Sequence, residues 1–170
     1  ARVTRDELLA ALRVPLSQEG ESGHRVIEAL AAEGSRGTHA SAGPRYFGFV
    51  IGGSLPVALA ADWLTSTWDQ NPGIYATSPF VSVVEDIARE WLLELFDLPR
   101  TASVGFVTGC QMAHFTCLAA APHGVVRRAG WDVEAEGLSG APHVNVVVST
   151  EAHVTIDVAM RYLGFGTRTL

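Results

Sequence analysis

The chain has 170 residues, of which 48% are hydrophobic and 18% charged, and its net charge at pH 7 is −6. This length is enough for one domain with its own core. The acidic balance, without any run of basic residues, argues against nucleic-acid binding, and no apolar stretch approaches the ~18–20 residues of a membrane span. Two cysteines do not make a disulfide framework, so we expect a cytoplasmic location. The large hydrophobic share predicts an exposed apolar surface and therefore a subunit interface.

Lysine is absent from the chain, because all 12 basic residues are arginine. A lysine amine is the side-chain group that forms a Schiff base with a carbonyl compound. The chain therefore cannot form such a Schiff base by itself.

The first third of the chain is predicted to form helices and loops. Residues 4–13 predict a short helix in which Thr4 and Glu7 make a capping box, and residues 24–33 predict a second helix that stops at Gly34. A loop of small residues follows over 34–43. Residues 44–53 (PRYFGFVIGG) are aromatic but too rich in glycine for a regular strand. They either fill a core or form the wall of a pocket or subunit interface.

Two longer helices are expected next. Residues 55–70 predict a helix with Pro56 in its first turn, followed by a turn around Pro72 and Gly73. Ser78 and Pro79 suit the N-cap and the first helical position of a long amphipathic helix that ends at Leu98.

The stretch over 102–121 (ASVGFVTGCQMAHFTCLAAA) combines an apolar run, a tight turn at Thr108-Gly109 and a helical pattern. A helix that begins directly after a strand points unpaired N–H groups and the positive end of its dipole at whatever lies above the turn. A phosphate is the natural ligand of such a place. An ordinary strand-to-helix connection without a ligand fits the same pattern, because Gly109 alone matches no glycine-rich nucleotide motif.

The last part of the chain repeats the alternation of strand and helix. A polar loop over 129–142 precedes a buried-type strand at 144–149, a helix from about Thr155 to Leu163, and the first residues of another strand at 167–170. This order predicts an α/β fold with a mostly parallel sheet. So few strands leave the faces of such a sheet uncovered, and we expect the fold to be incomplete without further chain.

Two groups of side chains carry candidate chemistry. His153 follows the predicted strand at 144–149, at the end where open α/β sheets bind ligands; it is either a ligand-facing residue or a surface histidine. Cys110, His114 and Cys117 share a helical face and are zinc-ligand types, with His153 as a candidate fourth ligand, although a buried Cys117 is an ordinary alternative. Cys110, at a helix N-terminus, is also a candidate nucleophilic thiol.

An ordered series of motifs resembles a known family. The series runs RYFGFV from Arg45, Leu55-Pro56, WDQN from Trp68, Ser78-Pro79 with Glu85, GFVTG from Gly105, and EAH from Glu151 with Asp157 after it. It resembles the group II pyridoxal-phosphate-dependent amino-acid decarboxylases, the glutamate and aromatic amino-acid decarboxylase family. The resemblance covers the chain from about residue 24 and corresponds to the N-terminal part only of such a protein. It implies a helical and extended interface segment at 1–54 and, at 55–170, the first portion of a fold-type-I large domain that binds the cofactor.

The resemblance also implies roles for individual residues. The turn at Gly109 and the backbone N–H groups of Cys110, Gln111 and Met112 would cradle the phosphate of pyridoxal 5'-phosphate. His153 would stack on the pyridine ring as the catalytic residue of this chain, and Thr155 stands where the family often has a small hydroxyl residue. Phe49, Ile51 and Asn71 fall where family members line the substrate pocket, partly across a dimer interface. The resemblance implies no metal ion.

Some positions depart from the family pattern. The histidine that often precedes the aromatic run is Gly43 here. The TGG turn and the small residue after it become Thr108-Gly109-Cys110-Gln111, and the usual asparagine becomes His114. The H-x-S-x-x-K pattern becomes His153-Val-Thr155-Ile-Asp-Val158.

The family places its Schiff-base lysine, and the aspartate that pairs with the pyridine nitrogen, further along than Leu170. In one interpretation, the chain is the N-terminal subunit or fragment of a pyridoxal-phosphate-dependent lyase in amino-acid metabolism. A second polypeptide then supplies the lysine and aspartate within a dimer or larger heteromeric assembly, and decarboxylation of an amino-acid-like molecule is the leading reaction. In the other interpretation, the chain is a degenerate, non-catalytic subunit that stabilises or completes a partner's active site.

Overall fold

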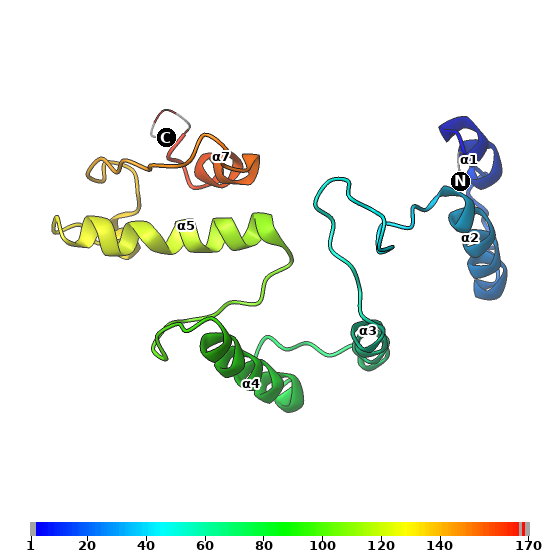
Figure 1. Ribbon diagram of the computed structural model, residues 1–170, viewed down its shortest axis with the longest axis horizontal. Coiled ribbons are helices and arrows are strands. Elements are labelled where there is room, and N and C mark those ends of the chain that lie inside the picture. Colours follow the sequence, from blue (N-terminus) through cyan, green and yellow to red (C-terminus); the bar gives the residue numbers. More distant parts are fainter. Residues whose placement is uncertain (1–2, 167, 169–170) are drawn as a thin grey trace. The chain divides into compact units, whose positions relative to one another are not determined.

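The computed structural model describes residues 3–166 and residue 168. In this part of the chain the regular secondary structure consists of seven helices, α1–α7 (Figure 1). The chain groups into two compact units, Ala1–Val81 and Ser82–Leu170. None of the described helices is long and apolar enough to cross a membrane.

The first unit begins with two helices that pack on each other, α1 (Arg5–Leu12) and α2 (Gly23–Gly37). Leu8 of α1 approaches the backbone of α2 at Gly37, where a Cβ would lie 3.3 Å from Leu8 Cδ1. A larger residue at Gly37 would require the Leu8 side chain to move by a few tenths of an ångström. The predicted end of α2 at Gly34 is wrong, because a single glycine costs a helix only about 1 kcal/mol. An ion pair between Glu33 and Arg36 supports the extra turn, with Arg36 favourably placed at the negative end of the helix dipole.

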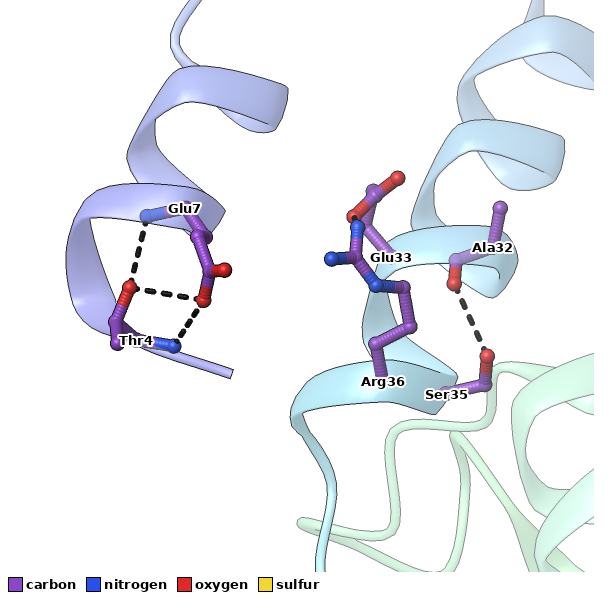
Figure 2. A network of polar contacts seen from close by, with 6 residues as sticks. All are labelled: Thr4, Glu7, Ala32, Glu33, Ser35 and Arg36. Carbon is purple, nitrogen blue, oxygen red and sulfur yellow. Dashed lines mark hydrogen bonds and ion pairs between the residues drawn. The ribbon is translucent and has the colours of Figure 1, made fainter. Parts of the chain in front are cut away.

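The capping box predicted at the start of α1 is confirmed, and Figure 2 shows its hydrogen bonds. The Glu7 N–H donates to Thr4 Oγ1 over 3.3 Å, while Glu7 Oε2 accepts from the Thr4 N–H at 2.7 Å and from the Thr4 hydroxyl at 2.9 Å. These donors stabilise the charged carboxylate. The backbone N–H of Thr4, its hydroxyl and the charge of Arg36 on α2 hold the pKa of Glu7 below its ordinary value.

The predicted helix over 55–70 is confirmed as α3 (Pro56–Trp68), with proline in its first turn and Asp69 in the left-handed conformation at its end. Trp68 meets Phe80 edge to face, with ring centroids 5.7 Å apart, a favoured aromatic geometry. Before α3, residues 44–53 form no regular element, as expected for their glycine content. Phe49 is 90% exposed, so this segment does not fill a core of the described chain.

The second unit contains most of α4 (Pro79–Leu95), together with α5 (Cys110–Arg127), α6 (Val133–Glu136) and α7 (Val154–Tyr162). The helix predicted to start at Pro79 is confirmed as α4. α5 packs against α6 and against α7, and Figure 1 shows α7 beside α5. Short α6 was expected to be loop; Asp132 caps it by accepting from the Glu134 N–H at 3.0 Å. Among the described residues, the buried apolar side chains are Leu93 on α4, Pro122 and Val126 on α5, and Ala159 and Met160 on α7.

The predicted sheet is the main difference between expectation and structure. Residues 104–107 and 144–149 contain no strand, and of the strand predicted at 167–170 only Arg168 lies among the described residues. An apolar segment becomes a strand only when a neighbouring backbone pairs with its N–H and C=O groups, and neither segment has such a ladder here. Val147, predicted to be buried, is 93% exposed. The helical part of the α/β expectation is confirmed and the sheet part is not.

The pKa of Glu7 provides a test of the α1 cap. Because the folded-state pKa lies below the ordinary value, the cap contributes stability that is fully present above the unfolded glutamate pKa of about 4.3 and is lost as the pH falls through the folded-state pKa. We expect an NMR titration of the Glu7 carboxyl to give a midpoint below that value. Thr4→Ala should move the midpoint upward, whereas Ser35→Ala, on α2, should not. An unchanged midpoint in Thr4→Ala would contradict this account of the cap.

Met160 provides a test of the α7 packing. Its side chain is 1% exposed, and removing a buried side chain of this size leaves a cavity. We expect Met160→Ala to lower the free energy of unfolding by about 2–5 kcal/mol, measured by urea unfolding of the whole protein. Val154→Ala is the matched control on the same helix, because Val154 is 61% exposed and its removal should change stability by less than about 0.5 kcal/mol. Equal effects of the two substitutions would show that α7 is not anchored by Met160.

Candidate functional site

The candidate site lies where the N-terminal turns of α5 and α7 meet (Figure 1). α5 begins directly after the Thr108-Gly109 turn, and α7 begins directly after His153. The sequence predicted both beginnings. Hydrogen bonds between side chains of α5 and Thr155 of α7 join the two turns.

The N-terminus of α5 has no side-chain cap. Gly109 occupies the N-cap position, and the first helical hydrogen bond runs from the Ala113 N–H to the Gly109 carbonyl at 3.0 Å. The N–H groups of Cys110, Gln111 and Met112 therefore precede the first internal bond of the helix, where donors are left to an external acceptor. A Cβ built on Gly109 meets no other atom within 4 Å, so the space beside these donors is open.

The N-terminus of α7, in contrast, is capped by an imidazole. Nδ1 of His153 accepts from the Thr155 N–H at 3.3 Å, and the Thr155 hydroxyl lies 2.9 Å from the same nitrogen. The His153 side chain is otherwise exposed. Nδ1 of His153 is thus hydrogen-bonded to α7, and the rest of the ring is exposed.

Two side chains from the first turns of α5 reach Thr155. Nε2 of Gln111 donates to the Thr155 carbonyl at 3.2 Å, and Nδ1 of His114 lies 2.7 Å from Thr155 Oγ1. All three residues are half-buried. The structure therefore brings together the predicted site residues Gln111, His153 and Thr155. It adds His114, whose part was missed because the sequence pattern grouped it with the cysteines; its spacing of three residues from Gln111 was the available signal.

The cysteines do not form the alternative zinc site. Cys110 Sγ lies 4.0 Å from both ring nitrogens of His114, beyond a strong hydrogen bond. Both cysteines are exposed, so the expectation of a buried Cys117 is wrong. Among the described residues no group of three or more histidine, cysteine, aspartate or glutamate side chains could hold a metal ion.

The predicted substrate-pocket residues Phe49, Ile51 and Asn71 all lie in the first unit. Phe49 and Ile51 are exposed, and Phe49 has a left-handed φ of 59°. Asn71 belongs to a tight turn: its Oδ1 accepts from the Gly73 N–H at 3.0 Å, and its carbonyl accepts from the Thr77 hydroxyl at 2.7 Å. Their assignment to a substrate pocket stays a prediction.

The cluster in the second unit gathers several hydrogen-bond donors in one place. It offers backbone N–H groups at an uncapped helix end, a hydroxyl and two imidazoles, all of which can donate hydrogen bonds. In the part of the chain that is described, neither His114 nor His153 lies within ion-pair distance of a carboxylate. Donors of this kind bind anionic groups.

Comparison with known proteins gives relatives of one kind. The chain is 28% identical over 122 residues to an aromatic-L-amino-acid decarboxylase of Bacillus atrophaeus, covering 72% of this chain and 23% of the relative. It is 22% identical over 165 residues to the human acidic amino acid decarboxylase GADL1, covering 97% of this chain and 30% of the relative. No protein-family model matches the chain.

Comparison with solved structures finds a similar fold in mouse CSAD. The crystal structure of mouse CSAD superposes with a TM-score of 0.85 at 23% identity, over 99% of this chain and 34% of that one. Mouse CSAD in apo form gives a TM-score of 0.83 at 22% identity. The chain thus shares the fold of about a third of such a protein and spans about a third or less of the length of the relatives it matches. The predicted resemblance is confirmed: this chain is similar to the group II pyridoxal-phosphate-dependent amino-acid decarboxylases, with a coverage that fits their N-terminal part.

Proposed function

We propose that this chain provides the phosphate-binding turn and the ring-stacking wall of a pyridoxal-phosphate-dependent amino-acid decarboxylase. The observation that carries the proposal is the uncapped N-terminus of α5 held beside His153 by Thr155. The similarity to decarboxylases over nearly the whole chain supports the choice of cofactor and of reaction class.

The first turn of α5 suits a phosphate. The N–H groups of Cys110, Gln111 and Met112 would donate to its oxygens, and the positive end of the helix dipole favours its charge. The side chain of Gln111, bulkier than the small residue of the family pattern, is held by the Thr155 carbonyl. It therefore has a partner of its own, on the side of α5 that faces α7.

His153 suits the aromatic ring. Its Nδ1 is engaged with Thr155, which fixes the orientation of an exposed imidazole, and a neutral imidazole can stack on the face of another ring. When bound, pyridoxal phosphate supplies the electron sink that allows an amino acid to lose carbon dioxide. The part of His153 is to hold the ring plane in place while the reacting bond is oriented by the rest of the site.

We propose that Phe49, Ile51 and Asn71 line the substrate pocket across a subunit interface. The exposure of Phe49 and Ile51 supports a surface that another subunit covers, because large apolar side chains are seldom left in water as a group. The substrate is then an amino-acid-like small molecule.

The lysine that binds the cofactor lies outside these 170 residues in this proposal, because they contain no lysine. We propose that a second polypeptide supplies it, together with the aspartate that pairs with the ring nitrogen. The test is purification of the assembled protein from its native source. We expect mass spectrometry to find a lysine-containing polypeptide of about domain size, and the particle to show the visible absorbance of lysine-bound pyridoxal phosphate. A monomeric particle without that absorbance would overturn the proposal.

The alternative function is a non-catalytic subunit that completes a partner's site. It is favoured by the altered turn, in which Cys110, Gln111 and His114 replace the residues of the family pattern. An intact heteromeric assembly that lacks the visible absorbance of the bound cofactor would support this alternative over the first proposal.

Gly109→Asp separates cofactor binding from folding. The open space at Gly109 accommodates a side chain, and an N-cap carboxylate accepts hydrogen bonds from the first turn of α5 and favours its dipole. The helix should therefore remain folded while the carboxylate takes the place of the phosphate. Losing one charge-assisted hydrogen bond, about 1.5–3 kcal/mol, weakens binding at least about tenfold.

The measurement is the dissociation constant of pyridoxal phosphate from the assembled protein, by equilibrium dialysis, with unfolding followed in parallel. Gly124→Ala is the matched control, because Gly124 lies towards the other end of α5 and a Cβ there also meets no atom within 4 Å. It should leave cofactor affinity unchanged. Wild-type affinity in Gly109→Asp would place the phosphate elsewhere.

A further inference from the structure

The Thr155 hydroxyl lies between two imidazole nitrogens, which limits how protons can be arranged. Oγ1 of Thr155 is 2.7 Å from Nδ1 of His114 and 2.9 Å from Nδ1 of His153. A hydroxyl has one hydrogen to donate and can accept as well. The two nitrogens therefore cannot both be acceptors for this hydroxyl, and at least one of them must carry a hydrogen.

The backbone N–H of Thr155 determines which of the two nitrogens carries the hydrogen. The N–H of Thr155 points at Nδ1 of His153 over 3.3 Å, and an amide N–H can only donate. Nδ1 of His153 must then be the bare nitrogen of a neutral imidazole, whose lone pair also receives the Thr155 hydroxyl hydrogen. A hydrogen on this nitrogen would face the amide hydrogen and remove the cap of α7.

The same geometry fixes the state of His114. Since the Thr155 hydroxyl donates to His153, its oxygen is left to accept, and Nδ1 of His114 must be the donor. The resulting chain of hydrogen bonds runs from His114 Nδ1–H to Thr155 Oγ1, and from the Thr155 O–H to His153 Nδ1. It leaves the remaining hydrogen of His153 on Nε2, at the exposed end of the ring.

We propose that His114 is a positioning residue that directs the hydroxyl hydrogen of Thr155 to His153, and so reinforces the tautomer and the ring orientation that the Thr155 N–H imposes on His153. Few other polar groups compete for the two rings: Cys110 Sγ is 4.0 Å from His114, and among the described residues no carboxylate forms an ion pair with either ring. That the oriented His153 ring serves a cofactor rests on the proposed function; the tautomer arrangement does not.

The test is two-bond ¹H–¹⁵N NMR of histidine-labelled whole protein, recorded without and with pyridoxal phosphate. Without cofactor, we expect His153 to carry its hydrogen on Nε2 and His114 on Nδ1, with signals assigned by His114→Asn and His153→Asn. The opposite tautomer at His153, or bare Nδ1 atoms on both rings, would overturn the proposal. Expected tautomers without any cofactor binding would refute the proposed function and leave this inference standing.

Paired variants distinguish positioning from a merely structural role. Thr155→Val removes the hydroxyl at constant shape and leaves His153 with only the 3.3 Å bond from the backbone N–H. We expect the second tautomer of His153 to become detectable and His114 to lose its preference for a hydrogen on Nδ1, whereas Thr155→Ser should keep the wild-type spectrum. His114→Leu should release His153 in the same way. His114→Asn keeps an N–H donor at the same distance from the backbone and should preserve the His153 tautomer. Unchanged His153 signals in both Thr155→Val and His114→Leu would overturn the proposal.

Cofactor affinity gives a second readout. Loss of one neutral hydrogen bond of about 0.5–1.5 kcal/mol corresponds to about two- to tenfold weaker binding. We expect this loss for Thr155→Val and His114→Leu, and less than twofold for Thr155→Ser and His114→Asn. If Thr155→Val does not fold, His114→Leu with its partner His114→Asn decides the question, since His114 is not a buried core residue.

Discussion

The candidate site depends on the contact between α5 and Thr155. The Thr155 hydroxyl contacts His114, its carbonyl accepts from Gln111, and its N–H donates to His153, the residue that caps α7. The bonds to α5 are partly shielded from water, which makes them stronger than exposed ones. One turn further along, Ala159 and Met160 are buried. Polar bonds at the start of α7 and apolar packing in its middle therefore act together to hold the two helix N-termini side by side.

Two neighbouring helix N-termini add their positive ends at one place. At the start of α7 the imidazole of His153 accepts a hydrogen bond from an otherwise unpaired N–H, whereas α5 begins at Gly109, which has no side chain to accept one. The difference makes α5 the end that is open to an external acceptor. In the proposed function these two ends have separate tasks, with His153 facing the ring of the cofactor and the α5 turn facing its phosphate.

Local signals in the sequence predicted most of this frame. The Thr4 capping box, the proline at the start of α4 and the turn at Gly109 are all contained in a few neighbouring residues, and each was found where expected. The bond between Gln111 and Thr155 joins residues 44 positions apart, and no local pattern specifies which face of α5 meets α7. The predicted sheet is absent from the described residues for a related reason. Strand pairing requires neighbouring backbone, which a local pattern does not provide.

The departures from the family pattern are not scattered. Gln111, His114 and Thr155 each differ from the residue that the pattern has at their position, and in the structure they contact one another. Considered one at a time, the changes at Gln111 and His114 would be expected to impair phosphate binding at the turn. Seen together, they form one hydrogen-bonded unit in which the longer side chains on α5 have found partners on α7.

The segment 144–149 has a further consequence. Its sequence VNVVVS is uncharged and free of proline and glycine, and Val147 is 93% exposed. Segments of this composition are prone to stack into intermolecular cross-β aggregates when they lie open. Any polypeptide that covers the segment also stabilises the folded chain in proportion to its concentration. A polypeptide that covered the segment would therefore also protect the chain from aggregation and proteolysis.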